Sequence, residues 1–452
     1  MNTDLKTTIL KYDRAVPRYT SYPTAPHFKE GFSRETYVGW LEALPAQTAL
    51  SLYIHIPFCD VICWYCGCHT KATKRYEPVN DYVDMLIREI DMMAAHIPNH
   101  CIVKHLHFGG GSPTILQPAE FKRVMDALYR HFTFADDAER AIEGDPRGME
   151  DDKLKAYADT GINRVSLGVQ DFDPKVMETI NRVQPYEVVF DCVERIRKHG
   201  IDKLNMDFIY GLPFQTLDTT VKTMHQALTM TPDRLALFGY AHVPWMKKHM
   251  RLIKNETLPD KSLRYDLFNK AAEILRGAGY ETIGIDHFAK SDDPMAIQTR
   301  DGNLRRNFQG YTTDAANALV GFGVSSISEL PQGYVQNQPH NILYRELIGN
   351  DRIPVYRGIE KSAEDKLRKD VIDSLMCRFT VDVGAVCVAH GFAASALDDC
   401  FDELQEFERD GLARVEGRVV TIHPDALQIV RIIASAFDGY FKTGIARHSK
   451  AV

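Results

Sequence analysis

The sequence lacks long hydrophobic runs. No stretch of about eighteen consecutive apolar residues occurs in its 452 residues, so we expect no membrane span. Residues 1–16 have no apolar run after their lysines, so we expect no secretory signal. An excess of positive charge is also missing, because the net charge is −7. This charge argues against a general nucleic-acid-binding protein.

An even cysteine count, the usual mark of a disulfide framework, is missing too. The chain has nine cysteines, whereas secreted disulfide scaffolds are short and have an even number. We therefore predict a reducing, cytoplasmic compartment. Five cysteines are scattered and are expected to pack as small hydrophobes: Cys101, Cys192, Cys377, Cys387 and Cys400. The other four lie within residues 59–68, and such a group indicates metal or redox chemistry.

The middle of the chain alternates between two kinds of hydrophobic pattern. Helical patterns, such as that of residues 81–97, separate short apolar runs. This alternation predicts parallel βα units, and residues 280–288 could add a further strand. The apolar runs that we interpret as strands lie at 51–56, 104–111, 140–146, 164–172, 203–213 and 234–244.

Polar or glycine-rich residues follow most of these strands. A doubly wound sheet would gather its ligand at one switch point, whereas a barrel uses the ends of many strands. We therefore predict an α/β fold with a partial (β/α)6 barrel of the TIM type, which with an extension covers residues 46–355.

The two ends of the chain differ from this pattern. Residues 1–45 are predicted to be a loop-rich arm over the active site. Residues 356–452 are predicted to be a mainly helical cap domain, with a hairpin that turns at Glu416 and Gly417. Its order resembles a winged helix, but the acidic stretch at 398–410 makes a contact with DNA improbable.

The clustered cysteines have the spacing Cys-x3-Cys-x2-Cys, and Cys68 follows one residue later. Thiolates suit both iron–sulfur clusters and zinc. His69 could complete a zinc site, although ligands this close together leave little loop for a zinc knuckle. Three cysteines on a [4Fe–4S] cluster would instead leave one iron open for a cofactor or substrate.

The cysteine motif, with an aromatic residue before its third cysteine, resembles the radical S-adenosylmethionine superfamily. Other motifs resemble, in the same order, the oxygen-independent coproporphyrinogen III oxidases, also called coproporphyrinogen dehydrogenases. These motifs are PRYTSYPT at 17–24, SLYIHIPFC at 51–59, CGC at 66–68, HFGGGSPT at 107–114, EGDPR at 143–147, GVQDF at 168–172, DFIYGLP at 207–213, GYAHVP at 239–244 and NFQGYTT at 307–313.

The resemblance implies an enzyme of anaerobic haem biosynthesis. Such an enzyme converts two propionates of coproporphyrinogen III to vinyl groups and yields protoporphyrinogen IX. A deoxyadenosyl radical removes a hydrogen from the propionate β-carbon, and carbon dioxide and one electron then leave. The implied cofactors are one [4Fe–4S] cluster and S-adenosylmethionine, in two molecules. We further expect a small electron donor such as flavodoxin or ferredoxin, and a monomer.

The resemblance also assigns residues. It makes Cys59, Cys63 and Cys66 the cluster ligands and Cys68 a neighbouring non-ligand, unless Cys68 is merely a packed thiol. The implied contacts of the first S-adenosylmethionine are Tyr53, Gly110, Glu143 and Ile327, and those of the second are Tyr65, Gly111, Ser112, Gln170, Arg182, Asp207 and Ala241.

Some of these residues are informative in themselves. Asp207 lies in an apolar strand, where a buried carboxylate needs a partner. Glycines 109–111 either form a tight turn or let the backbone approach a ligand closely. The carboxyl group of Glu143 could accept hydrogen bonds from ribose hydroxyls, or could simply cap a loop.

The substrate carboxylates require cations, since guanidinium groups bind carboxylates in a bidentate manner. Arg18, Arg305 and Arg306 are candidates, although each could equally be a solvated surface residue. Tyr19 and Tyr22 could pack against the macrocycle or hold the arm to the barrel.

Two alternatives to this enzyme remain at the level of sequence. The first is a haem chaperone, or another tetrapyrrole-acting radical protein, on the same fold. The related chaperones lack the Cys-Gly-Cys ending, so Cys68 favours the oxidase. The second is a structural protein stabilised by zinc.

Overall fold

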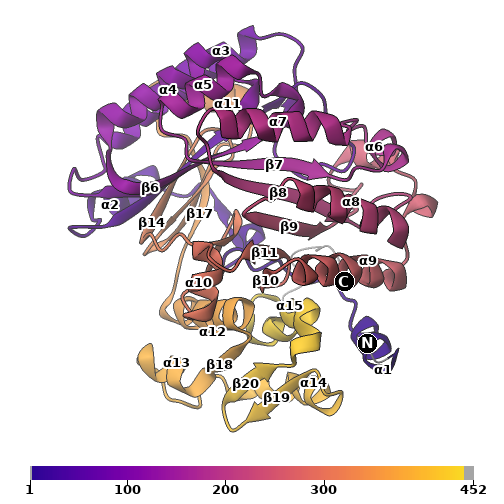
Figure 1. Cartoon of the computed structure of the whole chain (residues 1–452). Coiled ribbons are helices and arrows are strands. Elements are labelled where there is room, and N and C mark those ends of the chain that lie inside the picture. The colour runs from indigo at the N-terminus through magenta and orange to yellow at the C-terminus, as the bar shows by residue number, and fades with distance from the viewer. Residues whose placement is uncertain (1–2, 442–452) are drawn as a thin grey trace.

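A large curved sheet forms the centre of the molecule. The computed structural model describes residues 3–441 and contains a 13-stranded sheet. Helices cover its outer side, as a barrel of βα units requires (Figure 1). The predicted α/β fold with a partial barrel is confirmed. Seven neighbouring strands are parallel: β14 (Ala318–Phe322), β2 (Ala49–Ile56), β5 (Ile102–Gly110), β6 (Thr133–Gly144), β7 (Arg164–Gln170), β8 (Lys203–Tyr210) and β9 (Arg234–Gly239).

The helices between the strands are amphipathic. In α3 (Glu77–Ala94), Val79, Val83, Leu86 and Ile90 recur three or four residues apart and are buried against the sheet. Hydroxyl caps fix several helix starts, as at Thr216, whose side chain accepts from the backbone of Thr219 at 3.2 Å. The other helices of these units are α4 (Pro118–His131), α5 (Asp151–Asp159), α6 (Pro174–Thr179), α7 (Tyr186–Lys198), α8 (Leu217–Thr229) and α9 (Lys261–Gly277).

Antiparallel strands extend both edges of the parallel sheet. Beside β9, the single strand suggested at 280–288 is in fact a hairpin of β10 (Tyr280–Ile283) and β11 (His287–Lys290). Its turn contains Gly284, whose φ of +57° suits glycine. The strands at the other edge were not predicted: β15 (Ile327–Leu330), β16 (Gly333–Asn337), β17 (Val355–Glu360) and β1 (Lys29–Glu30). Three shorter elements accompany them: the paired β12 (Arg305–Asn307) and β13 (Gly310–Thr312), and α10 (Pro294–Arg300).

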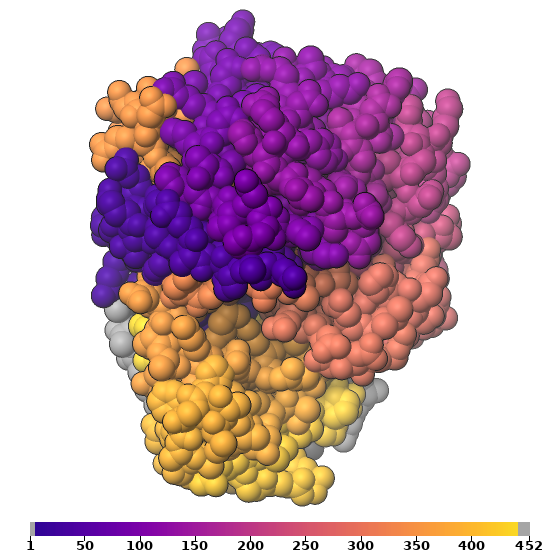
Figure 2. All heavy atoms as spheres, turned by 90° about the vertical axis from the view of Figure 1, so that its left-hand side faces the viewer, coloured from indigo at the N-terminus to yellow at the C-terminus, as the bar shows by residue number. Residues whose placement is uncertain are grey.

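The C-terminal part forms a lobe that lies below the large sheet in Figure 1, and Figure 2 shows this lobe as the lower part of the surface. Its hairpin turns between β19 (Ala413–Glu416) and β20 (Val419–Ile422), as expected from the sequence. The order helix, strand, two helices and hairpin is that of a winged helix. The remaining elements are α12 (Ala363–Arg378), β18 (Thr380–Asp382), α13 (Val383–Ala389), α14 (Gln405–Arg409) and α15 (Val430–Ala434). Strand β17 still belongs to the large sheet, so we propose to begin the cap at α12 rather than at residue 356.

The N-terminal segment is not as loop-rich as expected. It contains α1 (Thr3–Lys11) and α2 (Arg34–Glu42), and the chain between them passes through the junction of the two lobes (Figure 2). Tyr19 donates a hydrogen bond to Asp438 at 3.0 Å, and the Gly439 amide donates to the Tyr22 hydroxyl at 2.9 Å. The two tyrosines therefore bind the arm to the end of the C-terminal lobe. Among residues 3–441, no helix is both long and apolar enough to cross a membrane.

Candidate active site

The cysteine loop begins directly after β2. Phe58–Cys59 (β3) pairs with Lys71–Ala72 (β4), and this short ladder closes the loop at its base. The Lys71 amide donates to the Pro57 carbonyl at 3.0 Å, and the Thr73 amide donates to the Cys59 carbonyl at 2.9 Å. The four cysteines consequently lie at the carboxyl end of the central strands, which is the active-site face of such barrels.

The segment directly after α6 holds the tip of this loop. The Trp64 amide donates to the Ile180 carbonyl, and the Asn181 side chain donates to the Ile62 carbonyl, both at 2.9 Å. Sequence alone could not identify Asn181, because only the packed fold brings it to the loop.

Two further contacts come from the segment after β9. Lys247 donates to the Cys68 carbonyl at 2.7 Å, and the His249 imidazole donates to the Cys66 carbonyl at 2.8 Å. Three parts of the chain thus fix the loop before any cofactor binds. The sequence did not indicate a role for Lys247 or His249.

A cavity of about 440 Å³ opens beside the loop. Most of the residues expected to bind the cluster or S-adenosylmethionine line it together. Tyr53, Ala241 and Ile327 are absent from its wall, although Tyr53 lies directly behind it and bonds His55 at 2.9 Å. The expected residues in the wall are Cys59, Cys63, Tyr65, Cys66, Cys68, Gly110, Gly111, Ser112, Glu143, Gln170, Arg182 and Asp207.

Arg182 is the buried cation of this wall. One of its nitrogen atoms, Nη1, donates to the Cys63 sulfur at 3.5 Å and to the Asp145 carboxylate at 3.1 Å. Burial alone would raise the pKa of Asp145, but Arg182 and Arg147 lower it to about 2. Asp145 is therefore ionised and fixes Arg182 beside the thiol.

The other thiols also have polar neighbours. The Cys59 sulfur lies 3.2 Å from the Thr70 hydroxyl. A hydrogen bond between the Cys66 and Cys68 thiols lowers the pKa of Cys66. Cys68 is thus close to a predicted ligand.

The glycine triplet at the end of β5 lets that strand approach the loop closely. A Cβ atom at Gly110, where φ is +112°, would lie 2.5 Å from the His55 ring. The Gly111 amide donates to the Ile56 carbonyl, and the Ser112 amide donates to the Phe58 carbonyl, both at 2.8 Å. The triplet thus brings the end of β5 into direct contact with the start of the cysteine loop.

Glu143 ends β6 on the same side. His107 donates to its carboxylate at 3.0 Å and the Gly110 amide at 3.3 Å. Burial would raise the pKa of Glu143, but these two donors outweigh it and lower the pKa. The side chain therefore presents an ionised carboxylate to the cavity.

Asp207 is a sparsely hydrogen-bonded carboxyl group in the wall. The sequence indicated that it needs a partner, and within residues 3–441 its hydrogen-bond partner is the Ser166 hydroxyl, at 3.4 Å. Burial, followed by the nearby Glu143, raises the pKa of Asp207 to about 7. A cationic ligand in the cavity would supply the missing partner.

The donor set fits an iron–sulfur cluster with a bound cofactor. Three soft thiols face one cavity, Arg182 compensates negative charge beside Cys63, and two carboxylates provide acceptors for a cation. Within residues 3–441, no three His, Cys, Asp or Glu side chains converge closely enough to hold a single metal ion.

Comparisons with known proteins agree with this geometry. Residues 53–227 match the model of the radical SAM superfamily. The chain is 44% identical over 440 residues to the oxygen-independent coproporphyrinogen III oxidase of Bradyrhizobium diazoefficiens, covering 97% of this chain and 98% of that protein. The Salmonella typhimurium protein of the same name is 38% identical over 436 residues, covering 96% and 95%.

A solved structure is similar along almost the whole chain. The coproporphyrinogen III oxidase HemN from Escherichia coli, described as a radical SAM enzyme, has a TM-score of 0.89 and 36% sequence identity. The match covers 95% of this chain and 100% of that one.

Proposed function

The chain belongs to the oxygen-independent coproporphyrinogen III oxidases of the radical SAM superfamily, and from this premise we propose its reaction and the roles of its residues. The enzyme is an oxidoreductase that decarboxylates two propionate side chains of coproporphyrinogen III to vinyl groups and forms protoporphyrinogen IX. The observation that carries this proposal is the convergence of three thiols, Arg182, Glu143 and Asp207 on one cavity at the strand ends.

Cys59, Cys63 and Cys66 are proposed as the ligands of a [4Fe–4S] cluster. When bound, the cluster and S-adenosylmethionine supply the electron and the 5′-deoxyadenosyl radical that removes a hydrogen atom from the propionate. The contacts of the loop with Asn181, Lys247 and His249 hold these thiols in position. Cys68 is proposed as a neighbour that adjusts Cys66 through their shared hydrogen bond.

The surrounding wall is proposed to bind two molecules of S-adenosylmethionine. Glu143 and the carbonyl groups around Gly110 suit the ammonium and ribose hydroxyls of the first molecule, since both are hydrogen-bond donors. Asp207 and Arg182 suit the second molecule, because one attracts a sulfonium or ammonium group and the other a carboxylate. The under-satisfied Asp207 carboxyl supports this assignment.

Three features outside the cavity also belong to the proposal. A cytoplasmic location is supported by the nine free cysteines, because free thiols persist in a reducing compartment. Three of these thiols, in the cysteine loop, are partly or fully exposed. A small carrier such as flavodoxin or ferredoxin is proposed as the electron donor, since Asp60 and Val61 of the loop reach the surface. We propose a monomer as the working form.

An anaerobic assay tests the proposal. The reconstituted and reduced protein, supplied with S-adenosylmethionine, should convert coproporphyrinogen III to protoporphyrinogen IX. A haem chaperone on the same fold would bind a tetrapyrrole without converting it, and that outcome would refute the proposal.

A further inference from the structure

Three arginines from distant parts of the sequence converge near the cysteine loop. Arg18 lies in the arm, Arg306 in β12 and Arg431 in α15. Asp286 and Tyr210 influence the pKa of both Arg18 and Arg431, and Cys68 influences that of Arg18, so the groups lie close together. We call Arg18, Arg306 and Arg431 the arginine cluster.

Positive charge is in excess in this cluster. Asp286 is the carboxylate that faces all three arginines, and it already accepts a hydrogen bond from His287 at 2.7 Å. Burial, followed by the neighbouring Arg18, lowers the pKa of Arg431 to about 10. Gathering cations away from water is unfavourable unless anions compensate them. The cluster therefore has the charge pattern of a site for an anionic ligand.

Arg306 has donors to offer such a ligand. Its guanidinium packs 4.4 Å from the centre of the Tyr311 ring, and Nη2 donates to the Arg18 carbonyl at 3.4 Å. Its Nε and Nη1 atoms are buried and have no hydrogen-bond partner within residues 3–441. Arg18 is accessible, and its side chain makes no hydrogen bond or ion pair in the described part of the chain.

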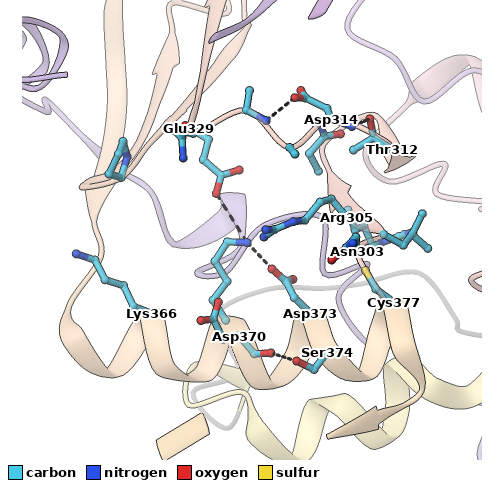
Figure 3. A pocket seen from close by; sticks show the side chains of 18 of the residues that line it. Asn303, Arg305, Thr312, Asp314, Glu329, Lys366, Asp370, Asp373, Ser374 and Cys377 are labelled. Atoms are coloured by element: carbon cyan, nitrogen blue, oxygen red, sulfur yellow. Dashed lines mark hydrogen bonds and ion pairs between the residues drawn. The ribbon is translucent and has the colours of Figure 1, made fainter. Parts of the chain in front are cut away.

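The neighbouring Arg305 has a different environment. Successive side chains of a strand point to opposite faces. Arg305 accordingly extends into a cavity of about 620 Å³, where it lies near Asp373 and Glu329 (Figure 3). Arg306 also lines that cavity, but its guanidinium packs on Tyr311 and reaches the arm. The sequence offered both arginines as candidates, and the structure gives their side chains different contacts.

Building on the proposed function, we propose that Arg18 and Arg306, with Arg431 beside them, bind the propionate carboxylates that the reaction leaves intact. Coproporphyrinogen III carries four carboxylates, and the two that are retained can serve as fixed anchors while the others approach the cofactor. Guanidinium groups bind carboxylates through paired, charge-assisted hydrogen bonds. Because the cluster joins the arm, β12 and the C-terminal lobe, a bound substrate would hold these parts together.

Equilibrium binding tests this assignment. Coproporphyrin III, the oxidised and fluorescent form of the substrate, is titrated anaerobically into the reconstituted holoenzyme and into Arg18→Gln and Arg306→Gln. Loss of a charged hydrogen bond should raise Kd about tenfold or more in each variant. The matched control Arg305→Gln should bind as the wild type does, and Arg306→Lys should recover part of the affinity.

Two further measurements distinguish a loss of carboxylate binding from general damage to the site. The tetramethyl ester of coproporphyrin III, which lacks carboxylates, should bind the wild type and all four variants equally. Binding of S-adenosylmethionine and its reductive cleavage without substrate should stay unchanged, which excludes a general loss of the site. One outcome overturns this inference and leaves the proposed function standing. In that outcome the wild type turns over substrate, but Arg18→Gln and Arg306→Gln bind coproporphyrin III as tightly as the wild type does. A wild type that neither binds nor converts the tetrapyrrole overturns both.

Discussion

The guanidinium of Arg182 donates to the sulfur of Cys63 at 3.5 Å, although 119 residues separate the two in sequence. Arg182 follows α6, whereas Cys63 lies in the loop after β2, and Asp145 holds Arg182 in place from the end of β6. With Cys63 as a proposed cluster ligand, we expect a cation beside this thiolate to stabilise its negative charge. We therefore propose that this contact influences the reduction potential of the cluster.

Arg182→Met should therefore make the cluster harder to reduce. We expect a more negative midpoint potential in an EPR-monitored redox titration, and a turnover rate lower by about tenfold or more. Arg147→Met is the matched control, because Arg147 also pairs with Asp145 but, within residues 3–441, makes no hydrogen bond to a cysteine thiol. Equal potentials in the wild type and Arg182→Met would contradict the role given to this residue.

The four clustered cysteines should separate into two classes. Replacing Cys59, Cys63 or Cys66 by Ala should abolish the visible spectrum and iron content of the cluster, whereas Cys68→Ala should retain both. Iron analysis after anaerobic purification distinguishes them. If Cys68→Ala also loses its iron, the ligand assignment is incorrect.

Asp207→Asn should reduce the number of bound S-adenosylmethionine molecules from two to one per chain. Among the described residues the carboxyl group has the Ser166 hydroxyl as its one hydrogen-bond partner, so its loss should affect the ligand more than the fold. Equilibrium dialysis with labelled S-adenosylmethionine measures the stoichiometry. Asp171→Asn is the control, since Asp171 is buried against Gln215 and Thr223 and does not line the cavity. A wild type that binds only one molecule would refute the two-site arrangement.

Glu89 should make the stability of the barrel depend on pH. Its buried carboxyl accepts hydrogen bonds from the Gly323 amide at 2.7 Å and from Asn337 and Tyr344, yet burial raises its pKa from 4.5 to about 7. The folded chain thus holds this proton more tightly than the unfolded chain. The contribution of Glu89 to the free energy of unfolding is therefore greatest below pH 4.5 and falls as the pH rises towards 7. The total loss is on the order of 3 kcal/mol.

Glu89→Gln should remove this pH dependence between about pH 4.5 and 7, as measured by urea unfolding at several pH values. Asp84→Asn is the control, because Asp84 lies on the exposed side of the same helix beside Arg123. Identical pH profiles for the wild type and Glu89→Gln would show that the buried carboxyl is not the cause.

The sequence predicted the parallel strands because each is an apolar run followed by an amphipathic helix. It missed β14 to β17, since these strands are only four to six residues long, β14 to β16 follow one another without a helix between them, and the pairing is antiparallel beyond β14. It identified Asp207 as an isolated carboxylate in an apolar strand. Sequence alone could not identify Lys247 or His249 as anchors of the cysteine loop, because their contacts exist only after β9 packs beside the other strands.

The fate of the propionate β-hydrogen tests the central claim most directly. Coproporphyrinogen III deuterated at the propionate β-carbons is incubated anaerobically with the reduced protein and S-adenosylmethionine, and 5′-deoxyadenosine is analysed by mass spectrometry. The account predicts deuterium in 5′-deoxyadenosine and the loss of two carbon dioxide molecules for each protoporphyrinogen IX formed. Deuterium-free 5′-deoxyadenosine, or no porphyrinogen product from a protein with an intact cluster, would contradict it.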